Sequence, residues 1–70
     1  MNGIVTQELV FDYLMERNPA TPVQIAEDLN VSLSAVNKRL LKLLYNGSVD
    51  RYENKSKLDH IYYFPVKERR

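Results

Sequence analysis

Apolar residues recur at helical spacing in the first part of the chain. Four of them share one face of a helix: Leu9, Val10, Tyr13 and Leu14. Thr6 is a suitable N-cap for this helix, and Asn18-Pro19 ends it because a residue before proline avoids the helical conformation. The pattern therefore predicts an amphipathic helix over residues 6–17.

A second helix is predicted after this break. Thr21 is a good N-cap, and Pro22 suits the first helical position. The apolar residues that follow form one stripe: Ile25, Ala26 and Leu29. Asn30 readily takes the left-handed conformation that closes a helix. This helix therefore covers residues 21–29 and leads into a tight turn.

A third helix begins almost at once, at Ser32. Its apolar positions fall on one face: Leu33, Val36, Leu40, Leu43 and Leu44. Gly47 is a natural C-terminal cap, so the helix is expected over residues 32–46.

The pattern then changes to short runs of β-branched and aromatic residues. Segments 48–53 and 60–64 read as two strands of a hairpin over residues 48–64, joined by a polar, basic loop and followed by a tail, 65–70. A two-stranded hairpin is not stable alone, so it must pack on the helices. The expected packing residues are Val49, Ile61 and some of Tyr62, Tyr63 and Phe64. The residues near Ala20 are a further candidate for a short third strand.

Composition narrows the class of protein. The chain has 70 residues, which allows one domain, residues 1–70, with a small core. It has no cysteine and one histidine, so disulfides, thiolate zinc sites and multi-histidine metal sites within one chain are excluded. Neither a nucleophile motif nor a glycine-rich phosphate loop is present. We therefore expect a cytoplasmic, non-membrane protein of the α+β class, mainly α, without enzymatic activity, cofactor or small-molecule ligand.

Charge is divided unequally along the chain although the net charge is only +1. Residues 1–35 contain one basic and five acidic side chains, a balance of −4, whereas residues 36–70 contain nine basic and four acidic side chains, a balance of +5. Such a division indicates a basic face and an acidic face. A basic face favours a polyanion such as nucleic acid, although both faces are equally compatible with ordinary solvated surface.

The order of elements and the residues of the turn resemble a winged helix-turn-helix domain of the small prokaryotic or viral transcriptional-regulator type. The resemblance rests on the segment from Thr21 to Ser32, on Val36 and Leu40, and on the tyrosine-rich final strand. It implies a three-helix fold with a C-terminal β-hairpin wing. It also implies a sequence-specific, double-stranded DNA-binding transcriptional regulator whose third helix enters the major groove.

The resemblance points to DNA-contacting residues on the third helix and in the wing loop. On the helix they are Ser34, Asn37, Lys38, Arg39, Leu41 and Lys42, and in the loop Lys55 and Lys57. Asparagine can pair with adenine, and lysine can reach guanine or a phosphate. Leu41 has three possible places: against a thymine methyl, in a dimer interface, or half-buried under the wing.

Two alternatives to this interpretation have to be weighed. The first is a winged helix that binds proteins as an accessory subunit without its own DNA specificity, which an apolar patch including Leu41 and Tyr45 would favour. The second is the winged-helix branch that binds left-handed Z-form nucleic acid. Asn37-Lys38 is similar to a pair in that branch, but Leu41 stands in place of its tyrosine, so the sequence does not favour it. For ordinary DNA we expect a homodimer, at least on the site itself.

Overall fold

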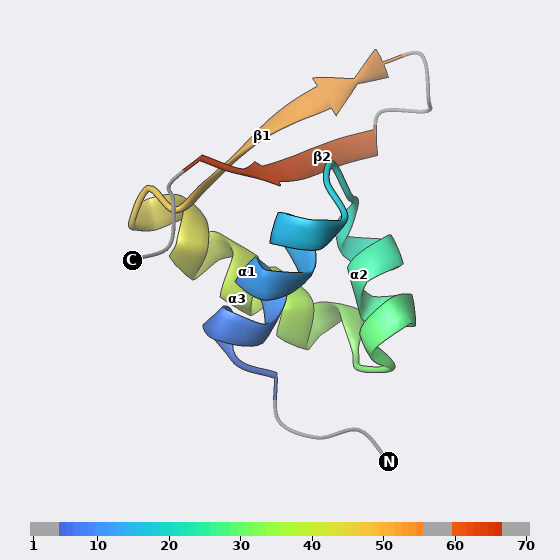
Figure 1. Cartoon of the computed structure of the whole chain (residues 1–70). Helices are drawn as coiled ribbons and strands as arrows, with labels where there is room; N and C mark the ends of the chain where they lie inside the picture. The colour runs from blue at the N-terminus through green and yellow to red at the C-terminus, as the bar shows by residue number, and fades with distance from the viewer. Residues whose placement is uncertain (1–4, 56–59, 67–70) are drawn as a thin grey trace.

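Three helices and an antiparallel hairpin follow one another in the computed structural model, which describes residues 5–55 and 60–66. The elements are α1 (Gln7–Glu16), α2 (Pro22–Leu29), α3 (Leu33–Tyr45), β1 (Val49–Asn54) and β2 (His60–Pro65). Figure 1 shows the helices grouped beneath the hairpin, with α1 in front of α3. The predicted order of elements is confirmed, and each helix or strand begins and ends within one residue of its expected bounds.

Hydroxyl caps begin all three helices, as the sequence predicts. The backbone N–H three residues after each cap donates to its side-chain oxygen, at 3.0 Å for Thr6, 3.2 Å for Thr21 and 3.1 Å for Ser32. These bonds satisfy N–H groups that have no partner inside the helix. The caps therefore fix where each helix starts, and with it which side of the helix faces the core.

The ends of α2 and α3 share one backbone motif. Asn30 has φ 59°, and the N–H of Val31 donates to the carbonyl of Ala26 at 3.0 Å. At the end of α3, Gly47 has φ 82°, and the N–H of Ser48 donates to the carbonyl of Leu43 at 2.9 Å. A left-handed residue followed by such a bond satisfies free carbonyls and turns the chain sharply. This motif lets α3 start only a few residues after α2 ends.

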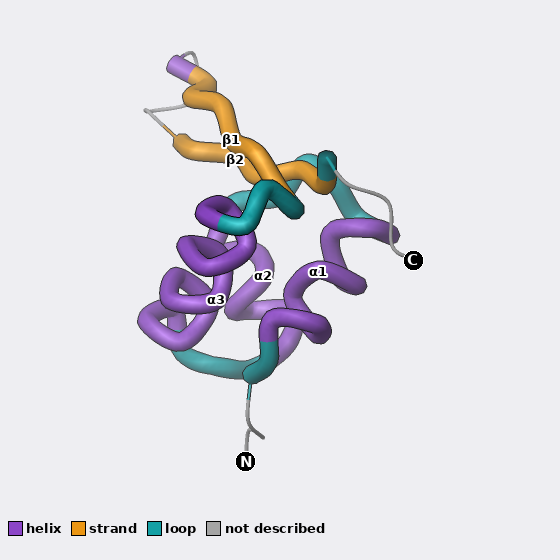
Figure 2. Tube along the Cα trace, turned by 90° about the vertical axis from the view of Figure 1, so that its left-hand side faces the viewer, coloured by secondary structure: helices purple, strands orange, loops and turns teal. Residues whose placement is uncertain are grey.

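One hydrophobic core joins the helices to the base of the hairpin. The buried residues are Val5, Val10, Phe11, Leu14, Ala20, Ile25, Ala26, Val36, Leu40, Leu43, Val49 and Tyr63. Every helix and both strands supply at least one of them, so the position of each element depends on the others. Figure 2 shows α1 and α3 as the two sides of the helical body, with the hairpin across one end.

The hairpin pairs in a simple register, with Val49 opposite Pro65 and Asn54 opposite His60. Ala20 adds a single bridge to Tyr63, with backbone hydrogen bonds of 3.1 and 2.8 Å in the two directions. The expected third strand is therefore one residue long. Because side chains alternate along a strand, Val49 and Tyr63 face the core while Tyr52 and Tyr62 face outward.

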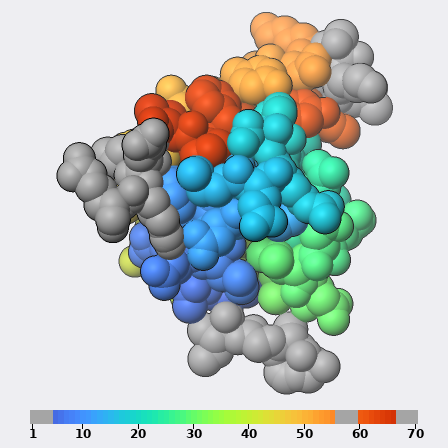
Figure 3. All heavy atoms as spheres, viewed as in Figure 1, coloured from blue at the N-terminus to red at the C-terminus, as the bar shows by residue number. Residues whose placement is uncertain are grey.

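Three residues that the apolar pattern placed on the core side are exposed instead. Leu9 on α1 is 41% exposed. Leu33 is 43% exposed because it is the first residue of α3, where only the α2–α3 turn and the start of α2 lie beside it. Ile61 is exposed because the far end of the hairpin extends past the helical body, as Figure 3 shows for β1. There Ile61 only borders an open groove with residues 21–23.

Candidate nucleic-acid interface

The side of α3 that faces away from the core is a mixed polar, basic and apolar surface. We call this set the α3 outer face; its members are Ser34, Asn37, Lys38, Leu41, Lys42 and Tyr45. All six are exposed. Leu41 is 41% exposed and Tyr45 84%, so the prediction that both point away from the core is confirmed. Lysine is the only charged residue type in this set.

The opposite side of α3 holds this surface in place. Val36 and Leu40 are completely buried and Leu43 nearly so. α3 contacts α1, α2 and β1, so it has little freedom to rotate about its axis. A helix whose buried stripe is fixed presents its outer side chains in a fixed direction. The α3 outer face is thus a rigid ridge, which is the form needed to enter a nucleic-acid groove.

Arg39 differs from its basic neighbours on α3. Its side chain is half-buried, and its Nε donates to the carbonyl of Val5 at 2.8 Å. The bond joins α3 to the residues that precede α1. The sequence grouped Arg39 with Lys38 and Lys42 as a DNA ligand, but the structure gives it an internal contact on the edge of the core. The exposed cations of α3 are therefore its two lysines.

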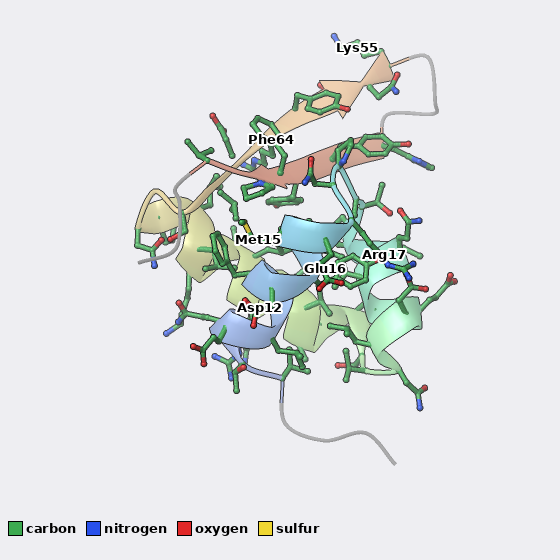
Figure 4. All side chains as sticks on the ribbon, in the orientation of Figure 1. Asp12, Met15, Glu16, Arg17, Lys55 and Phe64 are labelled. Carbon is green, nitrogen blue, oxygen red and sulfur yellow. The ribbon has the colours of Figure 1, made fainter. Side chains whose placement is uncertain are left out.

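The wing supplies one further exposed lysine among the described residues. Lys55 lies at the far end of β1, beyond the helices (Figure 4). Lys57, which was also expected to contact DNA, lies outside the described residues. Arg51 on β1 is a further basic residue of the wing, and it contacts Tyr63. Its Nη1 donates to the hydroxyl of Tyr63 at 3.1 Å, and its guanidinium lies 5.9 Å from that ring centroid.

The outer face of the wing carries an aromatic cluster that sequence reasoning did not separate from the core. The rings of Tyr52 and Tyr62 stack with centroids 5.7 Å apart, and Phe64 lies 6.0 Å from Tyr52. Such cross-strand pairs stabilise a hairpin. The cluster could have been predicted from the alternation of inward and outward positions along β2. That alternation puts Tyr62 and Phe64 on one face of the strand and Tyr63 on the other. The cluster explains why a two-stranded sheet keeps its shape here.

Acidic side chains gather on α1 and α2, away from the α3 outer face. They are Glu8, Asp12 and Glu16 on α1, and Glu27 and Asp28 on α2. Figure 4 shows Asp12 and Glu16 on the side of α1 turned to the viewer. α3 itself contains no aspartate or glutamate. Within the helices, the acidic side chains are therefore on α1 and α2 and the exposed lysines on α3, whereas β1 carries Asp50 and Glu53 beside basic residues.

A polar contact joins α1 to α2 on the acidic side. The hydroxyl of Tyr13 donates to Oδ2 of Asp28, and Arg17 Nη1 lies 3.8 Å from the same oxygen. Burial of the phenol, reinforced by the hydrogen bond to Asp28, raises the pKa of Tyr13 to about 12. The phenol therefore stays protonated and keeps its bond throughout the physiological pH range.

A metal centre and a membrane span can be assessed for the described part of the chain. Over residues 5–55 and 60–66 no group of three or more histidine, cysteine or acidic side chains is placed to hold a metal ion. None of the helices described is long and apolar enough to cross a membrane.

The chain matches a known protein family. Residues 5–68 match the family model described as the sugar-specific transcriptional regulator TrmB. The chain belongs to the TrmB family. This domain of a family of transcriptional regulators therefore has the winged-helix fold that the sequence predicted. No curated protein sequence matches the chain.

Solved structures give the same fold. A cysteine-to-serine mutant of ZitR from Lactococcus lactis superposes with a TM-score of 0.79 at 23% identity, over 96% of this chain and 47% of ZitR. Wild-type ZitR in complex with DNA gives a TM-score of 0.69 at 27% identity, over 86% of this chain and 40% of that one. The TrmB-family chain thus spans about half the length of these regulators.

A third similar structure belongs to the Z-form branch considered above. The Zalpha domain of PKZ from Carassius auratus, solved in complex with Z-DNA, gives a TM-score of 0.72 at 18% identity. It covers 86% of this chain, and this chain covers 90% of it. At that identity the likeness concerns the fold. Leu41 remains in the place where that branch carries tyrosine.

Proposed function

We propose that this TrmB-family domain binds double-stranded DNA as the DNA-reading part of a transcriptional regulator, with α3 in the major groove and the wing on the backbone or minor groove. The observation that carries the proposal is the α3 outer face, a rigid exposed ridge whose charged members are all cationic. Among the helices, acidic residues lie on α1 and α2 and none lies on α3. The wing carries Asp50 and Glu53 beside its basic residues. The ZitR complex with DNA supports the proposal by analogy.

The lysines have a common role in this proposal. Lys38 and Lys42 on α3, and Lys55 and Lys57 at the wing, neutralise phosphates on either side of the groove. Each phosphate contact releases counterions, so binding weakens as salt is added. Ser34, Asn37 and Leu41 lie on the same α3 outer face as Lys38 and Lys42, and in this proposal they carry the contacts to bases.

Protein binding is the less favoured function. It would require an apolar patch that includes Leu41 and Tyr45. Both are exposed and lie one turn apart, but Lys38 and Lys42 flank them on the same face. A surface with cations beside its apolar side chains suits a nucleic-acid groove better than the charge-depleted centre of a protein interface. We further infer that the domain acts in the cytoplasm, where it associates with the nucleoid, and by binding rather than catalysis.

Titration of a labelled duplex at several salt concentrations tests the proposal. Alanine at Lys38, Lys42 or Lys55 should each reduce the slope of log K against log salt by about 0.9. Arg17→Ala is the matched control, because Arg17 is an exposed cation on the acidic side, 3.8 Å from Asp28. It should leave the slope unchanged. Equal slopes for the wild type and all three lysine variants would exclude this face as the DNA-binding surface.

A further inference from the structure

Four exposed side chains in the first part of α3 form a compact group. They are Ser34, Asn37, Lys38 and Leu41. Asn37 and Lys38 are each three or four residues from Ser34 on one side and from Leu41 on the other. Side chains at that spacing have Cβ atoms about 5–6 Å apart on a helix surface. In helix-turn-helix proteins the N-terminal part of the reading helix meets the base edges. This group is therefore the part of the α3 outer face that faces base pairs.

Two members of the group have the chemistry of an A·T pair. The Asn37 amide carries a donor and an acceptor, which match the N7 acceptor and N6 donor of adenine. Leu41 has only methyl and methylene groups to offer. In the major groove the apolar feature among the bases is the C5-methyl group of thymine. Contact with that methyl removes the exposed part of Leu41 from water.

α3 offers few readers of a G·C pair: no acidic residue, no fully exposed arginine, and only lysines for guanine. Arginine is the commonest partner of guanine, and aspartate or glutamate accepts from cytosine N4. α3 has no acidic residue. Its arginine, Arg39, is half-buried with Nε bonded to the carbonyl of Val5. Lys38 is the lysine of this group that can reach guanine, and it lies on the side of the group next to Lys42, where phosphates are equally accessible.

The spacing of the two readers sets the spacing of the bases. Asn37 and Leu41 are four residues apart, which is about 6 Å along the helix axis. Successive base pairs are about 3.4 Å apart. We propose that α3 recognises A·T-rich steps, with Asn37 pairing to an adenine and Leu41 contacting a thymine methyl within about two base pairs of it. This inference rests on the proposed function and names the sequence class it selects.

Base analogues test the proposal on the full chain. Duplexes with a randomised centre are first selected for binding. The best site is then resynthesised with deoxyuridine in place of single thymines, which removes only the methyl group, and with 7-deazaadenine in place of single adenines, which removes N7. Selected sites should share at least two neighbouring A·T pairs. Loss of the critical methyl should weaken wild-type binding about fourfold.

Two variants assign each contact to its side chain. Leu41→Ala should bind the thymine and deoxyuridine duplexes equally. Its matched control is Leu9→Ala, because Leu9 lies on α1 with the same exposed fraction, 41%, and this variant should keep the wild-type discrimination. Asn37→Ala should lose about 5- to 150-fold in affinity for the selected site, keep its affinity for unrelated duplexes, and become insensitive to 7-deazaadenine.

The outcomes separate this inference from the proposed function. Salt-dependent binding to G·C-rich selected sites, or wild-type affinity unchanged by every deoxyuridine, would overturn the A·T readout and leave the DNA-binding proposal standing. Failure of the wild type to bind any duplex would overturn both. Circular dichroism reports whether each variant is folded. If Leu41→Ala does not fold, the wild-type comparison of thymine with deoxyuridine decides the matter.

Discussion

Arg39 and Lys38 are adjacent basic residues on the same helix, yet the structure gives them different surroundings. A step of one residue turns a helix by about 100°. Lys38 therefore lies on the exposed side of α3 and Arg39 at the edge of the core. There the carbonyl of Val5 accepts a hydrogen bond from Arg39 Nε. A local concentration of charge in the sequence does not reveal this difference, because the acceptor is supplied by a residue 34 positions away.

Replacing Arg39 distinguishes an internal contact from a phosphate contact. We expect Arg39→Ala to lower the free energy of unfolding by about 1.5 kcal/mol. The substitution removes a charged donor, and the carbonyl of Val5 loses its hydrogen bond. The salt dependence of DNA binding should not change. Lys38→Ala is the matched control and should change stability by less than about 0.5 kcal/mol. Urea unfolding followed by circular dichroism gives both values. A reduced salt slope with unaltered stability would return Arg39 to the DNA interface.

The Tyr13 hydroxyl makes stability sensitive to alkaline pH. Its pKa is raised from 10.0 in the unfolded chain to about 12 in the folded one by burial and by the bond to Asp28. Between these values the unfolded state has lost the proton that the folded state retains. The contribution of Tyr13 is therefore complete below about pH 10 and declines as the pH rises toward 12.

Tyr13→Phe should remove this part of the pH dependence. We expect the difference in unfolding free energy between wild type and variant to be constant up to about pH 9.5 and to shrink above it. Urea titrations at a series of pH values measure that difference. All other residues are the same in the two proteins, so their contributions cancel in the subtraction. A difference that stays constant up to pH 12 would show that the hydroxyl has an ordinary pKa.

At the scale of elements, the tight turn between α2 and α3 depends on one left-handed residue. Asn30 has φ 59°, a conformation that costs most residues with a Cβ atom about 1–2 kcal/mol. Asparagine tolerates it better because its short polar side chain bonds locally. The turn sets the position of α3 relative to α2, and so the direction of the α3 outer face.

Substitutions at Asn30 should follow backbone preference rather than side-chain polarity. We expect Asn30→Gly to be at least as stable as the wild type, and Asn30→Ala to be less stable by about 1 kcal/mol. Asn37→Ala, in the exposed middle of α3, provides the control for loss of an amide and should be nearly neutral. Thermal unfolding ranks the variants. An alanine variant as stable as the glycine variant would contradict the role of the left-handed conformation.

The elements themselves were predictable because their signals are local. Thr6, Thr21 and Ser32 begin helices through bonds to N–H groups three residues ahead, and Asn30 and Gly47 end them. The misplaced residues depend on distant partners. Leu33, the first residue of α3, borders a groove formed with residues of α2 and of the α2–α3 turn. Ile61 lies toward the far end of the hairpin, where it borders an open groove with residues 21–23 at the start of α2. The spacing of residues along the chain predicts the direction in which a side chain points. Whether that side chain is buried depends on which other elements lie in that direction.

For the molecule as a whole, the exposed apolar surface limits how two copies can associate. Val5 and Phe11 are buried in the core, so they are not available for contact between copies. Leu9 and Met15 remain exposed on α1. These two side chains make too small a patch on α1 for a stable dimer. The other large exposed apolar side chains among the described residues are distributed over α2, α3 and the wing: Val23, Leu33, Leu41, Tyr45, Tyr52, Ile61 and Val66. We therefore expect the free chain to be monomeric and DNA to bring two copies together on half-sites about one helical turn apart.

Sedimentation velocity tests this arrangement. The free chain should sediment as a monomer, and a complex with a selected palindromic duplex should contain two chains. Moving the half-sites by about half a helical turn puts the two copies on opposite sides of the duplex. It should leave two chains bound if the copies bind independently, and weaken binding of the second chain if they contact each other on the DNA. A one-to-one complex on the palindrome would contradict paired binding. A stable dimer without DNA would contradict the monomeric state instead.

The single bridge between Ala20 and Tyr63 gives the wing the mechanics of a cantilever. The amide of Tyr63 is bonded to Ala20 and its ring lies in the core, while the paired residues toward Asn54 and His60 extend past the helices without such support. Amide hydrogen exchange should therefore accelerate along the hairpin from Tyr63 toward His60. The end of the hairpin farthest from Tyr63 is therefore the end that moves most. In the proposed DNA complex, Lys55 at the far end of the hairpin can then follow grooves of different width while α3 keeps its position on the bases.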